Sequence, residues 1–439
     1  MDGYKLIVDG KDFIIKGMNW DYYPIGTNYT YSLWDQSDTT IKEVLDQEMT
    51  LLKNMGVNTL RIYVGIPKKW IAYIHKNYGI YTMLNHPFGR YGLTINGEWM
   101  ANTAYDHPQV RELLLREVSF LAEEYKDTPG LLFYLLGNEN NYGLYWKENE
   151  TNHGQEEKTS PTLNNRGMYK LFLLGKGNKN FAGGAKAQET LDFDQKVAQR
   201  AKAMYALFDE AALAMKSIDT RHPIALCNGD IMFIETIQEI CRNIDIFGTN
   251  MYRGISFGDS FQRVAEELEK PLLFTEFGAD AFNAITNKED QESQVYYLLR
   301  NWKEIYANAA GMGGAKNCIG GFTFQFSDSW WKVSQYENLD VHDQKATWNN
   351  GGYHKDANYG ANNMNEEWFG VCSKVPANSN GSYTLLPRAA YFVLAEVHKF
   401  SPYDSFSTLA LLEDYFKNLQ LDEAIKKSKA YGRSLENDD

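Results

Sequence analysis

The chain has 439 residues, of which 44% are hydrophobic and 23% are charged, proportions typical of a folded globular protein. This composition excludes wholesale disorder. The formal net charge of −13, with no basic block, disfavours nucleic acid as a partner. No apolar segment approaches the roughly 20 residues that a spanning helix requires, so we expect no membrane span.

The N-terminal sequence MDGYKLIVDGKDF lacks the charged and then apolar layout of a signal peptide. Localisation therefore stays open: we expect a periplasmic or secreted protein if a signal peptide has been removed, and a cytoplasmic protein otherwise. The sequence gives no indication of oligomeric state.

The chain carries no motif of a cofactor or metal site. It has no HExxH, no P-loop and no G-x-S-x-G elbow. The cysteines are widely spaced and form no CxxC pair, which argues against a zinc site or a disulfide scaffold. They are Cys227, Cys241, Cys318 and Cys372. We expect no cofactor and no metal.

From residue 13 onward, apolar β-like runs alternate with longer segments of helical periodicity. Eight such rounds are the count of a (β/α)8 barrel, so the pattern predicts an α/β fold of the TIM-barrel type. The expected strands are residues 13–20, 57–65, 79–87, 131–139, 223–230, 244–252, 271–278 and 321–328.

Two long insertions follow the fourth and eighth expected strands, at residues 141–193 and 329–386. Both exceed an ordinary βα loop, and both leave from the carboxyl ends of strands, so we expect walls or lids over the catalytic face. A structureless excursion is the alternative for the first. Residues 403–439 indicate one further amphipathic helix with an acidic tail. We therefore predict a barrel over residues 1–402 and a helical extension packed on it over 403–439.

Glutamates end only two of the eight expected strands: Glu139 on the fourth and Glu276 on the seventh. The carboxyl ends of these strands face each other across the mouth of a closed barrel, so the two carboxylates can converge. Glycoside hydrolysis uses such a pair, about 5–5.5 Å apart in retaining enzymes and about 6.5–9.5 Å apart in inverting ones. For either glutamate alone, a solvated or salt-bridged loop residue is the favoured interpretation; it is the pair at equivalent positions that favours catalysis.

Several short motifs together resemble one class of glycosidase. They are Asn138-Glu139 after an apolar strand, Glu276 in TEFGAD, Arg61 in GVNTLRIY, and FTFQFSDSWW on the eighth strand. As a set they resemble the retaining (β/α)8 glycosidases with catalytic glutamates on strands four and seven. Within that group, the sequence most resembles the catalytic barrel of the family-2 glycoside hydrolases and the β-1,3-glucanosyltransferases. The resemblance spans residues 13 to about 400 and implies that Glu139 is the acid/base and Glu276 the nucleophile.

The resemblance also implies substrate-binding roles near the two glutamates. Arg61 would supply a cation to the nucleophile, Asn138 would bind the sugar 2-hydroxyl, and Tyr252 would orient the nucleophile. The structural alternatives are a rim ion pair for Arg61, a turn residue for Asn138 and simple packing for Tyr252.

Further sugar contacts are expected at the ends of strands one, three and eight. Trp330, rather than its neighbour Trp331, is the expected stacking platform for a pyranose. Asn85 and His86 form a candidate hydroxyl-binding pair, although a purely structural histidine fits the sequence equally well. Trp20 is a weaker candidate.

These observations predict a retaining β-glycoside hydrolase that acts by double displacement on a β-linked oligo- or polysaccharide, with a β-glucan favoured. The alternatives are a transglycosylase that forms the same covalent intermediate, and a non-catalytic carbohydrate-binding barrel. The sequence begins almost at the first strand, without the β-sandwich domains of family-2 enzymes, which favours an open groove. Sugar identity, linkage, and endo or exo action stay open.

Overall fold

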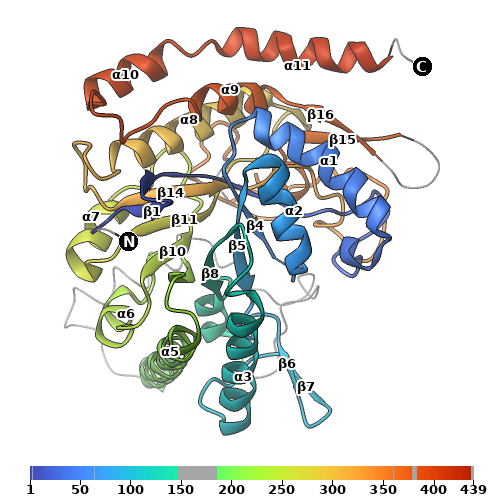
Figure 1. The fold of residues 1–439 in the computed structure, drawn as a ribbon. Coiled ribbons are helices and arrows are strands. Elements are labelled where there is room, and N and C mark those ends of the chain that lie inside the picture. The colour runs from blue at the N-terminus through green and yellow to red at the C-terminus, as the bar shows by residue number, and fades with distance from the viewer. Residues whose placement is uncertain (2, 64, 147–184, 359, 378–382, 437–439) are drawn as a thin grey trace.

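The computed structural model describes residues 1, 3–63, 65–146, 185–358, 360–377 and 383–436. Its centre is a closed barrel of eight parallel strands surrounded by helices (Figure 1). This confirms the predicted (β/α)8 fold. In chain order the barrel strands are β3 (Ile15–Asn19), β4 (Thr59–Ile62), β5 (Tyr81–His86), β8 (Leu131–Leu136), β9 (Ile224–Gly229), β10 (Ile246–Asn250), β11 (Leu272–Phe277) and β14 (Cys318–Thr323).

The strands are buried on both faces, which explains their continuous apolar runs. All six residues of β8 are buried. Phe133 and Leu135 belong to a small cluster inside the barrel, whereas Tyr134 and Leu136 belong to the larger core beneath the helices. The β1–β2 hairpin, Leu6–Val8 and Lys11–Phe13, brings Leu6 into the inner cluster.

Helices cover the outside of the barrel. Helix α1 (Asp38–Asn54) is typical: the Ser37 side chain accepts a hydrogen bond from the backbone N–H of Thr40, and apolar residues at helical spacing face the core. The other covering helices are α2 (Lys68–Tyr78), α3 (Pro108–Tyr125), α5 (Ala185–Ile218), α6 (Ile234–Ile240), α7 (Ser260–Arg263) with the π-helical turn η3 (Val264–Leu268), α8 (Gln291–Ala307) and α9 (Ala389–Val397).

The eighth strand differs from its predicted bounds. Strand β14 covers 318–323 rather than 321–328. Beyond Thr323 the regular strand ends, but the chain stays buried between the barrel and the second insertion. Phe324 N donates to Phe277 O (2.8 Å) of β11 and Phe326 N to Asn19 O (3.1 Å) of β3. In alternation, Gln325 N donates to Phe369 O (3.1 Å) and Asp328 N to Cys372 O (3.1 Å) of the second insertion. Burial by this neighbour produces the same apolar pattern as a barrel strand.

The insertions add structure at the carboxyl ends of the strands. Residues 147–184 of the first insertion lie outside the described residues; the part before them forms a 3-10 helix, η2 (Asn140–Tyr145). The second insertion contains the 3-10 helix η4 (Glu366–Trp368). The antiparallel pair β15 (Cys372–Pro376) and β16 (Tyr383–Pro387) leads into α9. Shorter hairpins are β6–β7 (Leu93–Ile95, Glu98–Met100) and β12–β13 (Phe282–Asn283, Lys288–Glu289).

The C-terminal segment forms two helices, α10 (Leu409–Lys417) and α11 (Leu421–Glu436), where the sequence predicted one. The break falls at Asn418, whose side chain donates to Asp414 O (2.8 Å) and so ends the first helix. Both helices lie outside α8 and α9 (Figure 1). The division at residue 402 into two units stays a prediction.

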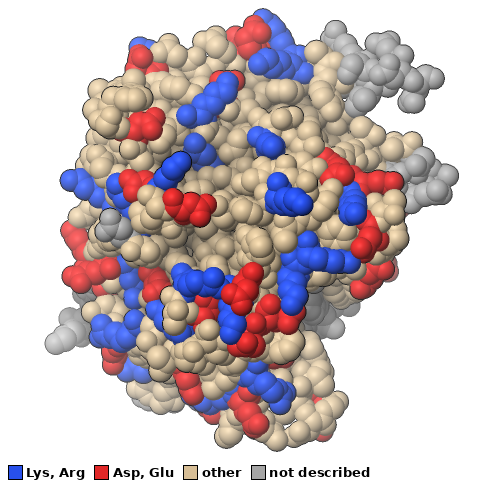
Figure 2. Space-filling view, in the orientation of Figure 1, with Lys and Arg blue, Asp and Glu red and all other residues tan. Residues whose placement is uncertain are grey.

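Acidic and basic side chains are interspersed over the face shown in Figure 2. None of the helices in the described part of the chain has both the length and the apolar character needed to cross a membrane.

Candidate active site

Glu139 lies in a tight turn at the carboxyl end of β8. Gly137 (φ 83°) and Glu139 (φ 57°) both have left-handed backbone conformations. For a non-glycine residue this conformation costs roughly 1–2 kcal/mol. The turn is held because Glu139 N donates to Cys227 O (3.0 Å) and Tyr142 N donates to Glu139 O (3.0 Å). A Cβ on Gly137 would come within 2.6 Å of Asn140 Oδ1, so glycine is required there.

Glu276 lies within β11 and is only 7% exposed. Three donors converge on its carboxylate. Oε1 accepts from Arg61 Nη1 (2.8 Å) and from the Tyr63 hydroxyl (2.6 Å). Oε2 accepts from the Tyr252 hydroxyl (2.9 Å). The carboxylate is therefore fixed in orientation, with Oε2 less occupied than Oε1.

Arg61 links the surrounding strands. Its side chain is fully buried and donates to Asn85 Oδ1 (3.0 Å), Asn138 Oδ1 (2.8 Å) and Asn250 Oδ1 (3.1 Å), in addition to Glu276. A guanidinium has five N–H donors in a rigid plane, which suits it to joining several acceptors. Arg61 thus lies beneath the mouth of the barrel, between strands far apart in the sequence.

Hydrogen bonds to both the oxygen and the nitrogen of its amide fix the orientation of the Asn138 side chain. Its Oδ1 accepts from Arg61 and from Asn250 Nδ2 (3.1 Å), while its Nδ2 donates to the Tyr91 hydroxyl (2.8 Å). The backbone oxygen of Asn138 accepts from Arg90 Nε (2.7 Å). The asparagine therefore belongs to the same hydrogen-bonded network as Glu276.

Burial, reinforced by the negative charge of Glu276, raises the pKa of the Glu139 carboxyl to about 7. Arg90, a hydrogen bond from Asn250, and Arg61 oppose this rise in pKa. A carboxyl with this pKa is partly protonated at neutral pH, so it can both donate and accept a proton there. Because the charge of Glu276 acts on the pKa of Glu139, the two carboxyl groups lie close enough to interact electrostatically.

The remaining predicted residues divide into two groups. Asn85 and Tyr252 lie in the network, and Asn85 Nδ2 also donates to Gly137 O (2.9 Å). His86 lies outside it: its Nδ1 accepts from Phe88 N (3.2 Å), and its Nε2 lies 3.5 Å from Glu117 of α3. A sugar-binding role for His86 stays a prediction.

Trp20, Trp330 and Trp331 pack in different surroundings. Trp20 is 1% exposed and donates to Glu48 Oε2 (2.6 Å). The Trp330 ring stacks on His342 at 5.0 Å between centroids, and His342 stacks in turn on Trp368 at 3.8 Å. The Trp331 ring instead contacts the rings of Tyr23 and Tyr29. The choice of Trp330 as the platform stays a prediction.

Sequence reasoning missed Tyr63, Asn250 and Arg90. A signal existed for two of them: Tyr63 follows Arg61 by two residues, and Asn250 ends β10 just before Tyr252. Polar residues at the carboxyl ends of barrel strands are candidates for the site by position alone. Arg90 lies in the loop after β5, where no periodicity marks it.

No family model matches the chain. The barrel nevertheless has the fold of solved glycosidases. Similar structures include a GH2 beta-galacturonidase of Eisenbergiella tayi bound to galacturonate, with 13% identity, a TM-score of 0.52, and coverage of 92% of this chain and 54% of that one. A beta-D-glucuronidase of Dictyoglomus thermophilum has 14% identity and a TM-score of 0.51, with coverage of 91% and 53%.

A curated relative is the probable 1,3-beta-glucanosyltransferase GAS3 of Saccharomyces cerevisiae, 31% identical over 135 residues. The match covers 30% of this chain and 24% of the yeast protein. This chain spans about half the length of the two solved structures. At 13% and 14% sequence identity, the similarity to them shows a shared fold and nothing more. The resemblance to these two groups of enzymes is thereby confirmed at the level of the barrel.

Proposed function

We propose that this protein is a retaining β-glycoside hydrolase that acts on a β-linked oligo- or polysaccharide, with a β-glucan as the favoured substrate. The observation that carries the proposal is the pairing of Glu276, held by Arg61, Tyr63 and Tyr252, with Glu139, whose pKa is about 7. One group is fixed for attack and the other is suited to proton transfer.

In the first step, Glu276 Oε2 attacks the anomeric carbon, because this oxygen accepts only the Tyr252 hydrogen bond while Oε1 is held by two donors. The bond to the leaving oxygen breaks, and Glu139 gives that oxygen its proton. In the second step, Glu139 takes a proton from water, the water oxygen bonds to the anomeric carbon, and the Glu276 carboxylate leaves.

The substrate class rests on the relatives. The yeast relative is named a probable 1,3-beta-glucanosyltransferase, and the solved structures are named beta-glucuronidase and beta-galacturonidase. These names share the β configuration, and the sequence match favours a glucan. The same yeast relative supports a second candidate: a transglycosylase, in which a sugar hydroxyl replaces water in the second step.

The test is a time course with β-1,2-, β-1,3-, β-1,4- and β-1,6-linked glucans, galactans and mannans. Products are resolved by size, and the anomer formed first is identified by proton NMR. We expect cleavage of one linkage with the β anomer formed first, and no cleavage by Glu276→Ala. The matched control is Glu123→Ala on α3, whose side chain is 63% exposed and pairs with Lys126.

Products longer than the substrate would assign the transglycosylase. An α anomer formed first would overturn the retaining mechanism, and wild-type cleavage by Glu276→Ala would overturn the assignment of the nucleophile.

A further inference from the structure

A shallow aromatic cleft opens beside the candidate active site, at the carboxyl ends of β3 and β4. Most of its lining is aromatic and includes Trp20, Tyr22, Tyr31, Trp34 and Tyr63, with Asp21 beside them. The cleft encloses only about 40 Å³, so a ligand would lie across its rings rather than inside it. Flat rings with polar edges suit the apolar face and hydroxyl rim of a sugar.

The cleft is connected directly to the candidate nucleophile. Tyr63 forms part of its wall, and the hydroxyl of Tyr63 donates to Glu276 Oε1 (2.6 Å). A sugar attacked by Glu276 would therefore have its neighbour within reach of this cleft. No wall residue comes from the turn that carries Glu139, so the cleft lies on the side of the glycone rather than of the leaving group.

Some polar groups of the cleft make no side-chain hydrogen bond to any described residue, although Asp21 interacts electrostatically with Lys374 and Lys332. In the described part of the chain, no side-chain hydrogen bond is found for Asp21, Tyr22, Tyr31 or Trp34, whereas Tyr63 bonds to both Asn19 and Glu276. The Tyr22 and Tyr31 rings lie 6.2 Å apart, and the Trp34 ring lies 6.1 Å from that of Trp20. Trp34 and Tyr31 are each partly exposed, so their rings can contact a ligand.

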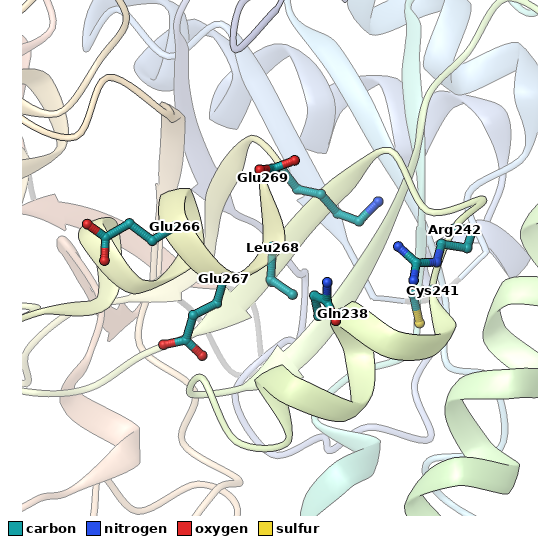
Figure 3. Close-up of a pocket in the computed structure, with 8 residues that line it drawn as sticks. Gln238, Cys241, Arg242, Glu266, Glu267, Leu268 and Glu269 are labelled. Atoms are coloured by element: carbon teal, nitrogen blue, oxygen red, sulfur yellow. The ribbon is translucent and has the colours of Figure 1, made fainter.

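A second hollow offers a contrast. It is larger, about 310 Å³. Its lining includes Arg242, just after α6, Glu266 and Glu267 of η3, and Glu269, which follows η3 (Figure 3). These segments lead into the amino ends of β10 and β11, so this hollow lies at the end of the barrel opposite Glu139 and Glu276. Of these two hollows, the aromatic cleft is the one that adjoins the reaction centre.

We propose that the aromatic cleft is a further sugar-binding subsite, which takes the pyranose next to the attacked one on the glycone side, with Trp34 as its principal stacking surface. This inference rests on the proposed function and deepens it. It implies a substrate of at least two sugars before the cleaved bond, and therefore a preference for oligosaccharides over single glycosides.

The experiment uses the full chain with two probes that share one leaving group, 4-nitrophenyl β-glucoside and 4-nitrophenyl β-laminaribioside. We expect the wild type to have a higher kcat/KM on the bioside. Trp34→Ala should lower that value about 10-fold through KM and leave the glucoside within about 2-fold. Trp34→Phe should restore most of the loss. Phe120→Ala is the control, because Phe120 lies on α3 and is 69% exposed.

A wild type that gains nothing from the second sugar would overturn the subsite, as would an equal loss on both probes in Trp34→Ala. If thermal unfolding shows that Trp34→Ala does not fold, Tyr31→Ala is the second variant, with the same expected difference between the probes. The proposed function fails separately: in that case the wild type turns over neither these probes nor any glycan of the linkage panel.

Discussion

Arg61 and Arg388 are both buried arginines that lie close to a buried carboxylate. Arg61 Nη1 is 2.8 Å from Glu276, and Arg388 Nη1 is 2.7 Å from Asp328. Arg388 binds both oxygens of Asp328, and Gly370 N donates to Oδ1 as well (3.0 Å). Arg61 binds only one oxygen of Glu276, and the other accepts from a neutral hydroxyl.

This difference separates a structural ion pair from a reactive one. The Asp328 side chain is 0% exposed, and its pair joins the segment after β14 to the start of α9. The Glu276 side chain is 9% exposed, and among the described residues its Oε2 accepts a hydrogen bond from the Tyr252 hydroxyl alone. A carboxylate with both oxygens in a bidentate pair is stabilising, whereas one with a less occupied oxygen can react.

The largest expected effect comes from Glu276→Gln. An amide cannot form the glycosyl ester, so we expect kcat to fall on the order of 10⁴-fold. The amide oxygen can still accept from Arg61, but the buried Arg61 charge loses its carboxylate partner, so the thermal midpoint should fall as well. Steady-state kinetics and thermal unfolding measure the two effects. If this variant kept more than a tenth of the wild-type activity, Glu276 would have a structural role, like that of Asp328, and not a catalytic one.

Glu139→Gln should reduce kcat/KM, which reports the glycosylation step, by about 10²–10⁴-fold on a natural glycoside, the usual contribution of a general acid. The loss should be much smaller on an aryl glycoside, whose leaving group needs no proton. A pair of substrates that differ only in the leaving group measures this difference. Equal losses on both would show that Glu139 does not act as the acid.

The pH dependence follows from the same carboxyl. Because the pKa of Glu139 is raised to about 7, the protonated form predominates below pH 7 and is lost above it. We expect kcat/KM on a natural glycoside to fall as the pH rises through about 7. Glu139→Gln should remove this basic limb from the pH–rate profile. A limb that survives in the variant would belong to another group.

Asp328→Asn tests the other member of the comparison. The substitution removes one of the two carboxylates that Arg388 binds, while Glu289 Oε1 still accepts from its Nε (2.7 Å). The cost should therefore lie at or below the about 3–5 kcal/mol of a broken buried pair. We expect that loss in the free energy of unfolding, measured with denaturant, while activity per folded molecule changes less than 10-fold. The exposed pair Lys426–Glu423 is the control, and Glu423→Gln should leave stability unchanged.

The smallest effect is expected from Tyr252→Phe, which removes the hydrogen bond to Glu276 Oε2. A hydrogen bond to a charged group contributes about 1.5–3 kcal/mol, so kcat/KM should change about 10–100-fold. Tyr63→Phe removes the bond to Oε1 and is the matched variant. If attack proceeds through Oε2, the two variants should differ in kcat; equal losses would contradict that assignment.

The sequence by itself determined the barrel and the positions of both glutamates. Apolar runs alternating with helical periods identify βα units because each element must bury a face of known period. Glu139 and Glu276 stood out because they end two such runs. Arg61 also had a local signal, since alternation along β4 points it into the barrel while Leu60 and Ile62 face the outer core.

Only the tertiary structure decided what these residues contact. Arg61 meets Asn85, Asn138 and Asn250 because barrel closure brings together the ends of β4, β5, β8 and β10. The bounds of β14 depended on pairing with residues far along the chain, as did the direction of His86 away from the network. Periodicity reports which residues are buried and which elements they form, but the partner of a buried polar group is set by contacts that are remote in sequence.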